Sequence, residues 1–294
     1  MTDRTTRIDQ SKPSIARVYD YLLGGTDNYA VDREVGDYFI RDLPGSVSIA
    51  FANRQALVRA VAAMARDGIR QFVDLGSGLP TADNVHQVAR RHRPDARVVY
   101  VDNDPTVLAH GGRLLAADDR TALVDADLRE PEALYRDPGL RRLIDVEEPL
   151  GVVFSAVLHH LDDSERPADL VRWWADRVPP GSRVYISHFR SGGNEETRLA
   201  ERKLQESFGR GRWRTDEEIA GLFGGLDLLE PGLVHCSLWR PDPVPGGDGP
   251  EAAPGGARPD ADVTGPDATG AGVTDGSGLS VWERLISCAL ARKP

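Results

Sequence analysis

The run at residues 72–81, Phe-Val-Asp-Leu-Gly-Ser-Gly-Leu-Pro-Thr, constrains the fold of this chain most. An apolar segment ends in an acid and a glycine-rich turn, and a second apolar segment, 98–102, also ends in an acid. This pattern predicts strand, tight turn, helix and strand, the first half of a nucleotide-binding α/β sheet. Glycines at 76 and 78 let backbone N–H groups approach a ligand. Asp102 falls where such folds place an acid against ribose hydroxyls.

The turn departs from the dinucleotide-binding pattern G-x-G-x-x-G, because Thr81 takes the place of the third glycine. Asp74, directly before the turn, would repel a diphosphate and attract a cation. We therefore expect S-adenosylmethionine (SAM), which carries a ribose, an ammonium and a sulfonium. Two alternatives stay open at this point: an NAD-dependent oxidoreductase on the same fold, and a non-catalytic SAM-binding regulator.

Composition narrows the classes of function. The chain has 294 residues, 40% of them hydrophobic, and a net charge of −10. Such an acidic chain is not expected to bind nucleic acid. No apolar run approaches the roughly 20 residues of a membrane span. The polar N-terminus lacks an apolar signal region, so we expect a cytoplasmic location and no membrane association. The two cysteines, Cys236 and Cys288, predict neither a disulfide framework nor a metal site.

Hydrophobic periodicity gives the order of the elements. Before residue 68 the chain reads as three helices, at 14–23, 29–43 and 48–67. Strands then alternate with helices, which predicts a parallel sheet covered on both faces. The expected strands are 70–75, 97–102, 121–126, 150–157 and 183–188, and the expected helices are 81–91, 106–117, 132–144 and 164–178.

The last third of the chain contains an unusual segment. After two helices at 195–208 and 215–223, and a strand at 232–239, residues 241–278 are rich in Gly, Pro, Ala and Asp. This segment has almost no large apolar side chains, so we predict disorder. The run 281–291 predicts a closing strand, antiparallel to 232–239. We divide the chain into an N-terminal helical lid (1–68), a SAM-binding core (69–240), the insert (241–278) and the closing strand of the core (279–294).

Several motifs together resemble a known family. They are residues 13–33, Pro-Ser-Ile-Ala-Arg-Val-Tyr-Asp-Tyr-Leu-Leu-Gly-Gly-Thr-Asp-Asn-Tyr-Ala-Val-Asp-Arg, with the turn at 76–81, Val-Asp-Asn-Asp-Pro at 101–105 and Leu-His-His-Leu at 158–161. The chain resembles the mainly actinobacterial S-adenosyl methyltransferase family, formerly a domain of unknown function, over nearly its whole length apart from 241–278.

The resemblance implies a Rossmann-like class I methyltransferase of the α/β class. Its sheet would have seven mostly parallel strands with an antiparallel last strand, under a helical N-terminal lid. It also implies a SAM-dependent methyltransferase. We expect the acceptor, which the sequence does not identify, to be a small molecule that is methylated on oxygen or nitrogen.

The resemblance further implies which residues bind the cofactor. Asp74 would hold the methionyl ammonium, Asp102 both ribose hydroxyls and Asp127 the adenine amino group. The residues expected to lie along the rest of the ligand are Gly76, Ser77, Gly78, Asn103, Ser155 and Ala156. The alternative for Asp74 is a carboxylate that caps the turn, and for Asp127 an acid on a solvated turn.

The N-terminal helices carry a second group of candidates. A double glycine at 24–25, followed by Asp-Asn-Tyr, suits a segment that folds over a ligand and excludes water. We expect Tyr19, Asn28 and Tyr29 to approach the cofactor or the acceptor, and Arg17 to clamp a carboxylate. The alternative is that the tyrosines are half-buried packing residues.

Histidines are the candidates for a general base. His159, His160 and His188 fall at the predicted carboxyl ends of strands, where open α/β sheets bind their ligands. A histidine of near-neutral pKa can deprotonate an acceptor hydroxyl or amine. His159 and His188 are our first choices for the catalytic base; the alternative for each is that it packs or caps a helix.

Overall fold

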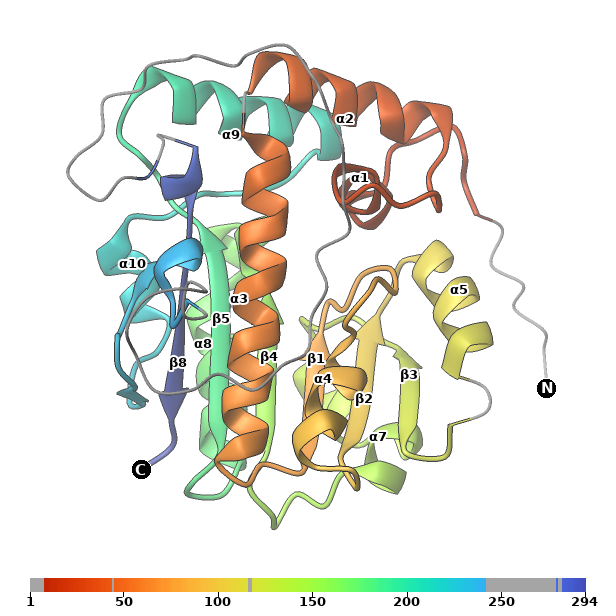
Figure 1. The fold of residues 1–294 in the computed structure, drawn as a ribbon, viewed down its shortest axis with the longest axis vertical. Coiled ribbons are helices and arrows are strands. Elements are labelled where there is room, and N and C mark those ends of the chain that lie inside the picture. The colour runs from red at the N-terminus through yellow and green to blue at the C-terminus, as the bar shows by residue number, and fades with distance from the viewer. Residues whose placement is uncertain (1–7, 44, 116–117, 242–278, 280–281) are drawn as a thin grey trace, which may run out of the picture.

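A computed structural model describes residues 8–43, 45–115, 118–241, 279 and 282–294 (Figure 1). The segment 241–278, for which the sequence predicts disorder, lies outside the described residues apart from Pro241.

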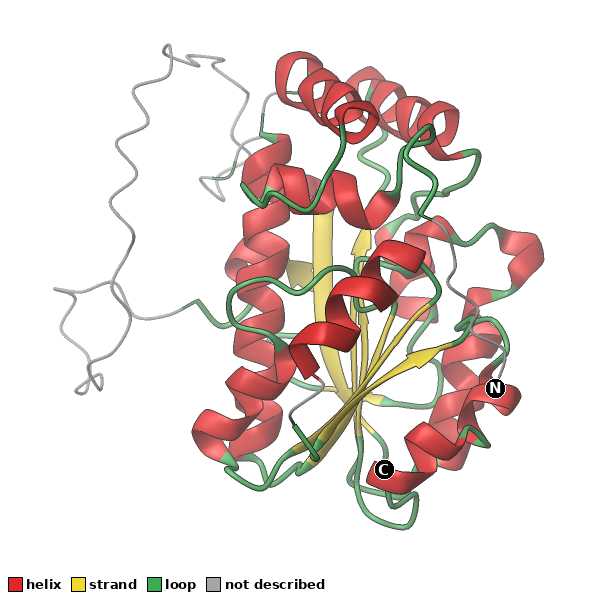
Figure 2. Ribbon diagram, turned by 90° about the vertical axis from the view of Figure 1, so that its right-hand side faces the viewer, coloured by secondary structure: helices red, strands yellow, loops and turns green. Residues whose placement is uncertain are grey.

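One twisted sheet runs through the molecule (Figure 2). In the described residues it has eight strands in the order β3-β2-β1-β4-β5-β8-β6, and β7 also pairs with β8. Strands β1 to β5 are parallel, whereas β8 is antiparallel to its neighbours. The strands are β1 Gln71–Leu75, β2 Arg97–Asp102, β3 Thr121–Asp125, β4 Gly151–Ser155, β5 Arg183–Phe189, β6 Asp227–Leu228, β7 Val234–His235 and β8 Ile286–Arg292.

The prediction of a mostly parallel α/β sheet with antiparallel pairing at the chain end is confirmed. The sheet has one strand more than the seven expected, because both β6 and β7 add two residues to β8. The strand predicted at 232–239 is short, since the chain turns into a 3₁₀ helix at Cys236–Leu238.

The described helices are α1 Ile15–Leu22, α2 Ala30–Asp42, α3 Ser46–Arg66, α4 Val85–His92, α5 Pro105–Leu115, α6 Pro131–Tyr135, α7 Pro138–Leu143, α8 Pro167–Arg177, α9 Glu195–Phe208 and α10 Asp216–Gly221. Short 3₁₀ helices occur at Leu158–His160, Asp163–Glu165, Cys236–Leu238 and Glu283–Leu285. No helix among the described residues combines the length and the apolar character that crossing a bilayer requires.

Local signals explain where helices begin. The helix predicted over 132–144 is two helices, because Pro138 has no backbone N–H and starts α7. The Asp137 side chain accepts from the N–H groups of Gly139 and Leu140 and so caps that helix. Helix α4 begins at Val85 rather than 81, after a capping box formed by Asn84 and Gln87.

Strand β2 shows why helices cover both faces of the sheet. Val98 and Tyr100 belong to the core that contains the buried side of α3, whereas Val99 and Val101 belong to the core that contains Trp174 of α8. Successive side chains of a strand point to opposite faces, so a strand that is apolar throughout needs a helix layer on each side.

The N-terminal helices take two positions relative to the sheet. Helix α3 runs along one face and contacts α4, β4 and β8 (Figure 1). Helices α1 and α2 pack on each other and lie, with α9, beyond the carboxyl ends of the strands (Figure 1). A space between these helices and the strand ends holds the site described next.

Candidate active site

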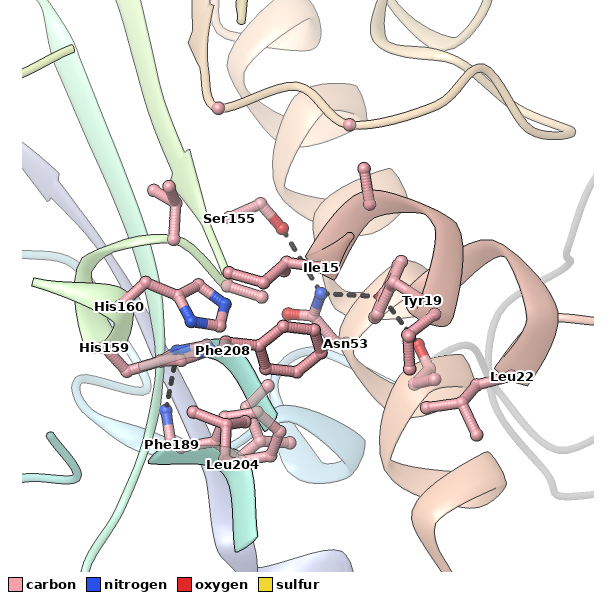
Figure 3. A pocket seen from close by; sticks show the side chains of 18 of the residues that line it. Ile15, Tyr19, Leu22, Asn53, Ser155, His159, His160, Phe189, Leu204 and Phe208 are labelled. Carbon is pink, nitrogen blue, oxygen red and sulfur yellow. Dashed lines mark hydrogen bonds between the residues drawn. The ribbon is translucent and has the colours of Figure 1, made fainter. Parts of the chain in front are cut away.

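A cavity of about 340 Å³ lies at the carboxyl ends of β1, β2 and β4. Residues that end or follow these strands line it, among them Asp74, Asp102 and Ser155. Side chains of α1, α2, α3 and α9 line another part of it, and those of α1, α3 and α9 are seen in Figure 3. From β1 the chain first adds β2 and β3 on one side of the sheet and then β4 and β5 on the other side. Open α/β sheets bind ligands at the strand ends where the order reverses in this way.

The turn after β1 folds back onto β2. The N–H groups of Gly76 and Ser77 donate to the Val101 carbonyl at 2.8 and 3.1 Å. Gly76 has a φ of +73°, and a Cβ there would lie 2.4 Å from Cγ2 of Val157. Only glycine fits both the backbone conformation and the space at position 76. The turn that it allows, Gly76, Ser77 and Gly78, forms part of the cavity wall.

Asp102 holds this turn and its own loop in place. The carboxyl accepts from the Gly78 N–H at Oδ2 (2.8 Å) and from the Asp104 N–H at Oδ1 (2.9 Å). Burial raises the pKa of Asp102, and these backbone hydrogen bonds oppose the rise. Asn103 lies beside it in the cavity lining.

Asp74 is a buried carboxyl with only 4% of its surface exposed. Burial raises its pKa to about 7; the positive charge of Arg54 opposes the rise and the negative charge of Asp102 adds to it. Such a group is stabilised in its charged form by any cation that enters the cavity.

Arg54 of α3 lines the same part of the cavity. Its Nη2 donates to the carbonyls of Ala82 and Asp83 at 3.0 and 2.9 Å, while its buried Nε has no partner among the described residues. The sequence predicts Arg17 as the carboxylate clamp and gives no such role to Arg54. An arginine in a helix whose buried positions are mostly apolar was the available signal.

Asp127, after β3, is part of an ion-paired chain at the cavity edge. The guanidinium of Arg129 contacts both carboxyl oxygens of Asp127 at 2.5–3.0 Å and lowers the pKa of that carboxyl. Glu165 then accepts from Arg129 at 2.5 Å and from Arg210 at 3.0 Å. This series of ion pairs therefore links the loop after β3 to the segment that follows α9.

Ser155 belongs to a polar network that connects the strand ends to the helices (Figure 3). The Asn53 Nδ2 lies 3.4 Å from Ser155 Oγ and 2.9 Å from the Tyr19 hydroxyl, and Asn53 Oδ1 accepts from Ser187 at 2.6 Å. The Tyr19 hydroxyl donates to the Ala50 carbonyl at 3.0 Å. Tyr19 lines the cavity, although its hydroxyl is already bonded within the protein.

Ala156 continues the wall after Ser155. Its φ of +51° is unusual for a residue with a side chain. Its N–H donates to the Ser187 hydroxyl at 2.9 Å and thereby fixes the turn. Strained backbone of this kind is often found at binding sites.

The structure places Arg17 outside the described residues that line the cavity. Its guanidinium donates to Asp32 (2.7 Å), Thr106 Oγ1 (3.1 Å) and the Lys12 carbonyl (2.6 Å). It also lies over the Tyr29 ring, 5.1 Å from the centroid. Arg17 therefore ties α1 to α2 and to the start of α5.

Asn28 and Tyr29 are not among the described lining residues either. The Asn28 amide donates to Asp20 Oδ2 at 3.1 Å and to the Gly25 carbonyl at 2.9 Å, which fixes the loop between α1 and α2. Tyr29 precedes α2, and its N–H donates to Asp32 at 2.8 Å. Both residues shape the loop rather than the cavity wall.

The three histidines differ in their surroundings. His159 lines the cavity, and its Nδ1 accepts from the Phe189 N–H at 3.3 Å. His188 is fully buried outside the described lining: its Nδ1 faces the Phe189 carbonyl (2.6 Å) and its Nε2 faces Arg214 (3.0 Å). Both ring nitrogens of His188 are thus occupied, and burial lowers its pKa to about 3.

His160 also lines the cavity, and only 9% of its surface is exposed. Its buried Nδ1 has no hydrogen-bond partner among the described residues. Burial, with a smaller effect of Arg210, lowers the pKa of His160 to about 4. The ring is therefore neutral near pH 7.

A family model described as S-adenosyl methyltransferase matches residues 1–262. The chain belongs to the S-adenosyl methyltransferase family. The resemblance predicted from the sequence is thereby confirmed. The protein is a SAM-dependent methyltransferase, and the alternative of an NAD-dependent oxidoreductase is set aside.

Two solved structures are similar over almost their whole length. A proposed methyltransferase from Thermobifida fusca is 40% identical, with a TM-score of 0.84, 97% of this chain covered and 96% of that chain. A DUF574 family protein from Streptomyces avermitilis is 34% identical, with a TM-score of 0.82, 98% of this chain covered and 100% of that chain. A comparison with curated proteins finds no match.

Several cavity residues of this methyltransferase escaped the sequence analysis, because they approach from distant parts of the chain. They are Arg54, Phe189, Leu204, Phe208, Arg210 and Trp213. One signal was present for α9: Ala200, Leu204 and Phe208 recur every four residues and so share one face of the helix.

Proposed function

We propose that this methyltransferase transfers the methyl group of SAM to an oxygen or nitrogen of a small molecule. One observation carries the proposal: the buried carboxyl of Asp74 and the partly buried carboxyl of Asp102 share a single cavity of about 340 Å³ with side chains of four helices. That volume lies within the range of small-ligand sites. Helices wall the cavity opposite the strand ends, and such an enclosed space suits a small acceptor better than a polymer.

The residues at the strand ends fit SAM. We assign Asp102 to the two ribose hydroxyls, because backbone N–H groups already orient both of its oxygens. We assign Asp74 to the ammonium, since a cation offsets the cost of ionising a carboxyl that is 4% exposed. Arg54, next to Asp74, is our candidate for the carboxylate, to which guanidinium groups bind through paired N–H donors.

The remaining cofactor assignments follow the order of the strand ends. Asn103 and Asp127 are assigned to the adenine end, where Asp127 is also ion-paired to Arg129. The backbone of the turn lies along the ligand, and Ser155 with Ala156 faces the methionine portion. The residues of that turn are Gly76, Ser77 and Gly78.

The bound cofactor supplies a methyl group that its sulfonium activates. The protein has to align the acceptor with that methyl group and exclude water. The acceptor lone pair forms the new bond while the carbon–sulfur bond breaks, and the electron pair of that bond stays on sulfur. The acceptor proton goes to a base, and we assign this role to His160 because its Nδ1 is unpartnered among the described residues. His159 already accepts a hydrogen bond from Phe189.

Label transfer tests the proposal. The protein is incubated with methyl-labelled SAM and a cell extract that ultrafiltration has divided into metabolites and macromolecules. We expect label in the metabolite fraction, and much less with Asp102→Asn. Label confined to protein or nucleic acid would contradict a small-molecule acceptor.

A further inference from the structure

The part of the cavity beyond the cofactor residues is apolar. Its lining comes from α1, α2, α3, α9 and the segment before β8. The large apolar residues are Ile15, Val18, Leu22, Phe39, Leu43, Ile49, Leu57, Leu204, Phe208, Trp282, Leu285 and Ile286. Among the described lining residues that these elements supply, Arg54 is the single charged one, and it lies beside Asp74.

Flat aromatic surfaces form one side of this region. The rings of Phe189 and Trp213 are stacked, with centroids 4.8 Å apart and planes 16° from parallel. The His159 ring meets Phe189 edge-on at 4.5 Å. Phe208 of α9 lines the same cavity as His159 and His160 (Figure 3). Such rings bind a planar aromatic ligand through stacked and edge-to-face contacts.

The same region contains polar atoms that lack partners. The Nδ1 of His160 and the hydroxyl of Ser46 are buried and unbonded among the described residues, and both residues line the cavity. Leaving such groups unpaired costs free energy, which a hydroxyl or N–H of a ligand can recover once the side chain turns toward it, because neither atom is exposed to the cavity in this conformation. A neutral polar group suits them, because the basic lining residues nearby are already engaged. Arg210, whose charge lowers the pKa of His160, pairs with Glu165 at 3.0 Å, and we assign Arg54 to the cofactor.

We propose that the acceptor is an uncharged, planar aromatic compound that carries a hydroxyl or an N–H group. Its ring lies against Phe208 and the Phe189 side of the cavity, with the reacting oxygen or nitrogen toward His160. The inference rests on the proposed function and narrows its acceptor class. An ionised acceptor would lose its hydration here without gaining a counter-ion that is not already paired, since Arg210 is bound to Glu165.

A matched set of ligands tests the acceptor class. S-adenosylhomocysteine is first titrated into the protein by calorimetry, which establishes the cofactor site independently. With that site saturated, we expect 2-naphthol to bind at least about tenfold more tightly than three relatives of similar size. These are the anion 6-hydroxy-2-naphthoate, the cation 2-naphthylmethylammonium and the non-aromatic decahydro-2-naphthol.

Two variants of α9 test the location. Phe208→Ala removes a ring that lines the cavity, whereas Leu199→Ala removes a side chain that is 43% exposed and outside the lining. We expect Phe208→Ala to weaken 2-naphthol binding by about tenfold or more, through lost apolar contact. Affinity for S-adenosylhomocysteine should stay within about twofold, and Leu199→Ala should leave both affinities unchanged.

His160→Gln tests the placement of the reacting atom. With methyl-labelled SAM, the wild type should convert 2-naphthol to 2-methoxynaphthalene. The variant should lose about a hundredfold in kcat while its KM for 2-naphthol changes little.

The outcomes separate the two proposals. If S-adenosylhomocysteine does not bind, the cofactor assignment fails. If it binds but the naphthoate or the ammonium compound binds as tightly as 2-naphthol, or none of the ring compounds binds, the acceptor class is wrong. Binding of 2-naphthol that is unaffected by Phe208→Ala would overturn its placement.

Discussion

The Nε of Arg17 donates to Oδ2 of Asp32 at 2.7 Å, and both side chains are almost completely removed from solvent. The pair joins α1 to α2 beyond the strand ends. Removing one partner of a buried pair leaves an uncompensated charge in the interior. We expect Arg17→Ala to lower the free energy of unfolding by about 3–5 kcal/mol in denaturant titrations.

An exposed ion pair provides the control. Arg136 and Glu132 pair at 2.7 Å on α6 and its end, with most of both side chains in solvent. Arg136→Ala should cost less than about 1 kcal/mol. If Arg17→Ala were as stable as the wild type and bound SAM more than about tenfold more weakly, Arg17 would be a ligand clamp after all.

The strand-end side of the cavity is predictable from the sequence because its signals are local. Asp74, Gly76 and Gly78 lie within five residues of one another, and strand pairing then brings Asp102 next to the turn. The parallel register of β1 and β2 follows from two apolar runs joined by a helix. This part of the site therefore follows from the sequence pattern alone.

The helical side of the site is less predictable, because tertiary packing decides which side chains face the cavity. The sequence shows that Arg17 and Asn28 are polar residues near a double glycine, but Asp32 and Asp20 accept their hydrogen bonds instead of a ligand. For His188 the sequence gives a partial signal. His188 and Phe189 are neighbours in β5, so their side chains point to opposite faces of the sheet and only one of them can face the cavity.

Asp102→Asn tests the ribose assignment. The amide keeps the size of the side chain but removes the negative charge that strengthens hydrogen bonds from hydroxyls. We expect the free energy of SAM binding to weaken by about 1–3 kcal/mol, or roughly fivefold to more than a hundredfold in affinity, in calorimetry.

Asp125→Asn is the matched control. Asp125 is exposed at the end of β3, directly across from Asp102 in the strand register, and is not among the described lining residues. Its substitution should leave SAM affinity unchanged. Equal losses in the two variants would mean that the effect is general electrostatics rather than ribose binding.

Asp74 should make SAM binding depend on pH. Burial raises its pKa to about 7, so below that pH the carboxyl is mostly protonated and cannot pair with a cation. SAM should therefore bind more tightly as the pH rises from about 5.5 to 7, by up to about tenfold per unit, and level off above. Calorimetry in buffers of different ionisation enthalpy should detect the proton released on binding.

The same shift has the opposite effect on the stability of the unliganded protein. Between the ordinary pKa of about 3.8 and the raised value of about 7, the folded protein binds the proton that the unfolded chain has lost. Stability should consequently fall as the pH rises through this window. Asp74→Asn should remove both effects; a variant that keeps the wild-type pH profile of SAM binding would assign it to another group.

Gly76 and Gly78 offer a pair of substitutions that separates backbone strain from lack of space. Both have positive φ, +73° and +66°, so an alanine at either site pays a similar conformational cost of about 1–2 kcal/mol. A Cβ at Gly78 meets nothing within 4 Å, whereas one at Gly76 lies 2.4 Å from Val157 Cγ2.

Gly76→Ala should therefore lower the free energy of unfolding by about 1–3 kcal/mol more than Gly78→Ala, because the well-packed interior has to yield. Adding Val157→Ala removes the obstructing methyl groups, so the double variant should regain most of that extra loss in denaturant titrations. Val157→Ala alone measures the cost of the cavity that it creates and completes the double-mutant cycle. Equal stability of Gly76→Ala and Gly78→Ala would contradict this prediction. It would mean that the loop after β4 can move away from the turn, and that the contact with Val157 does not require glycine at position 76.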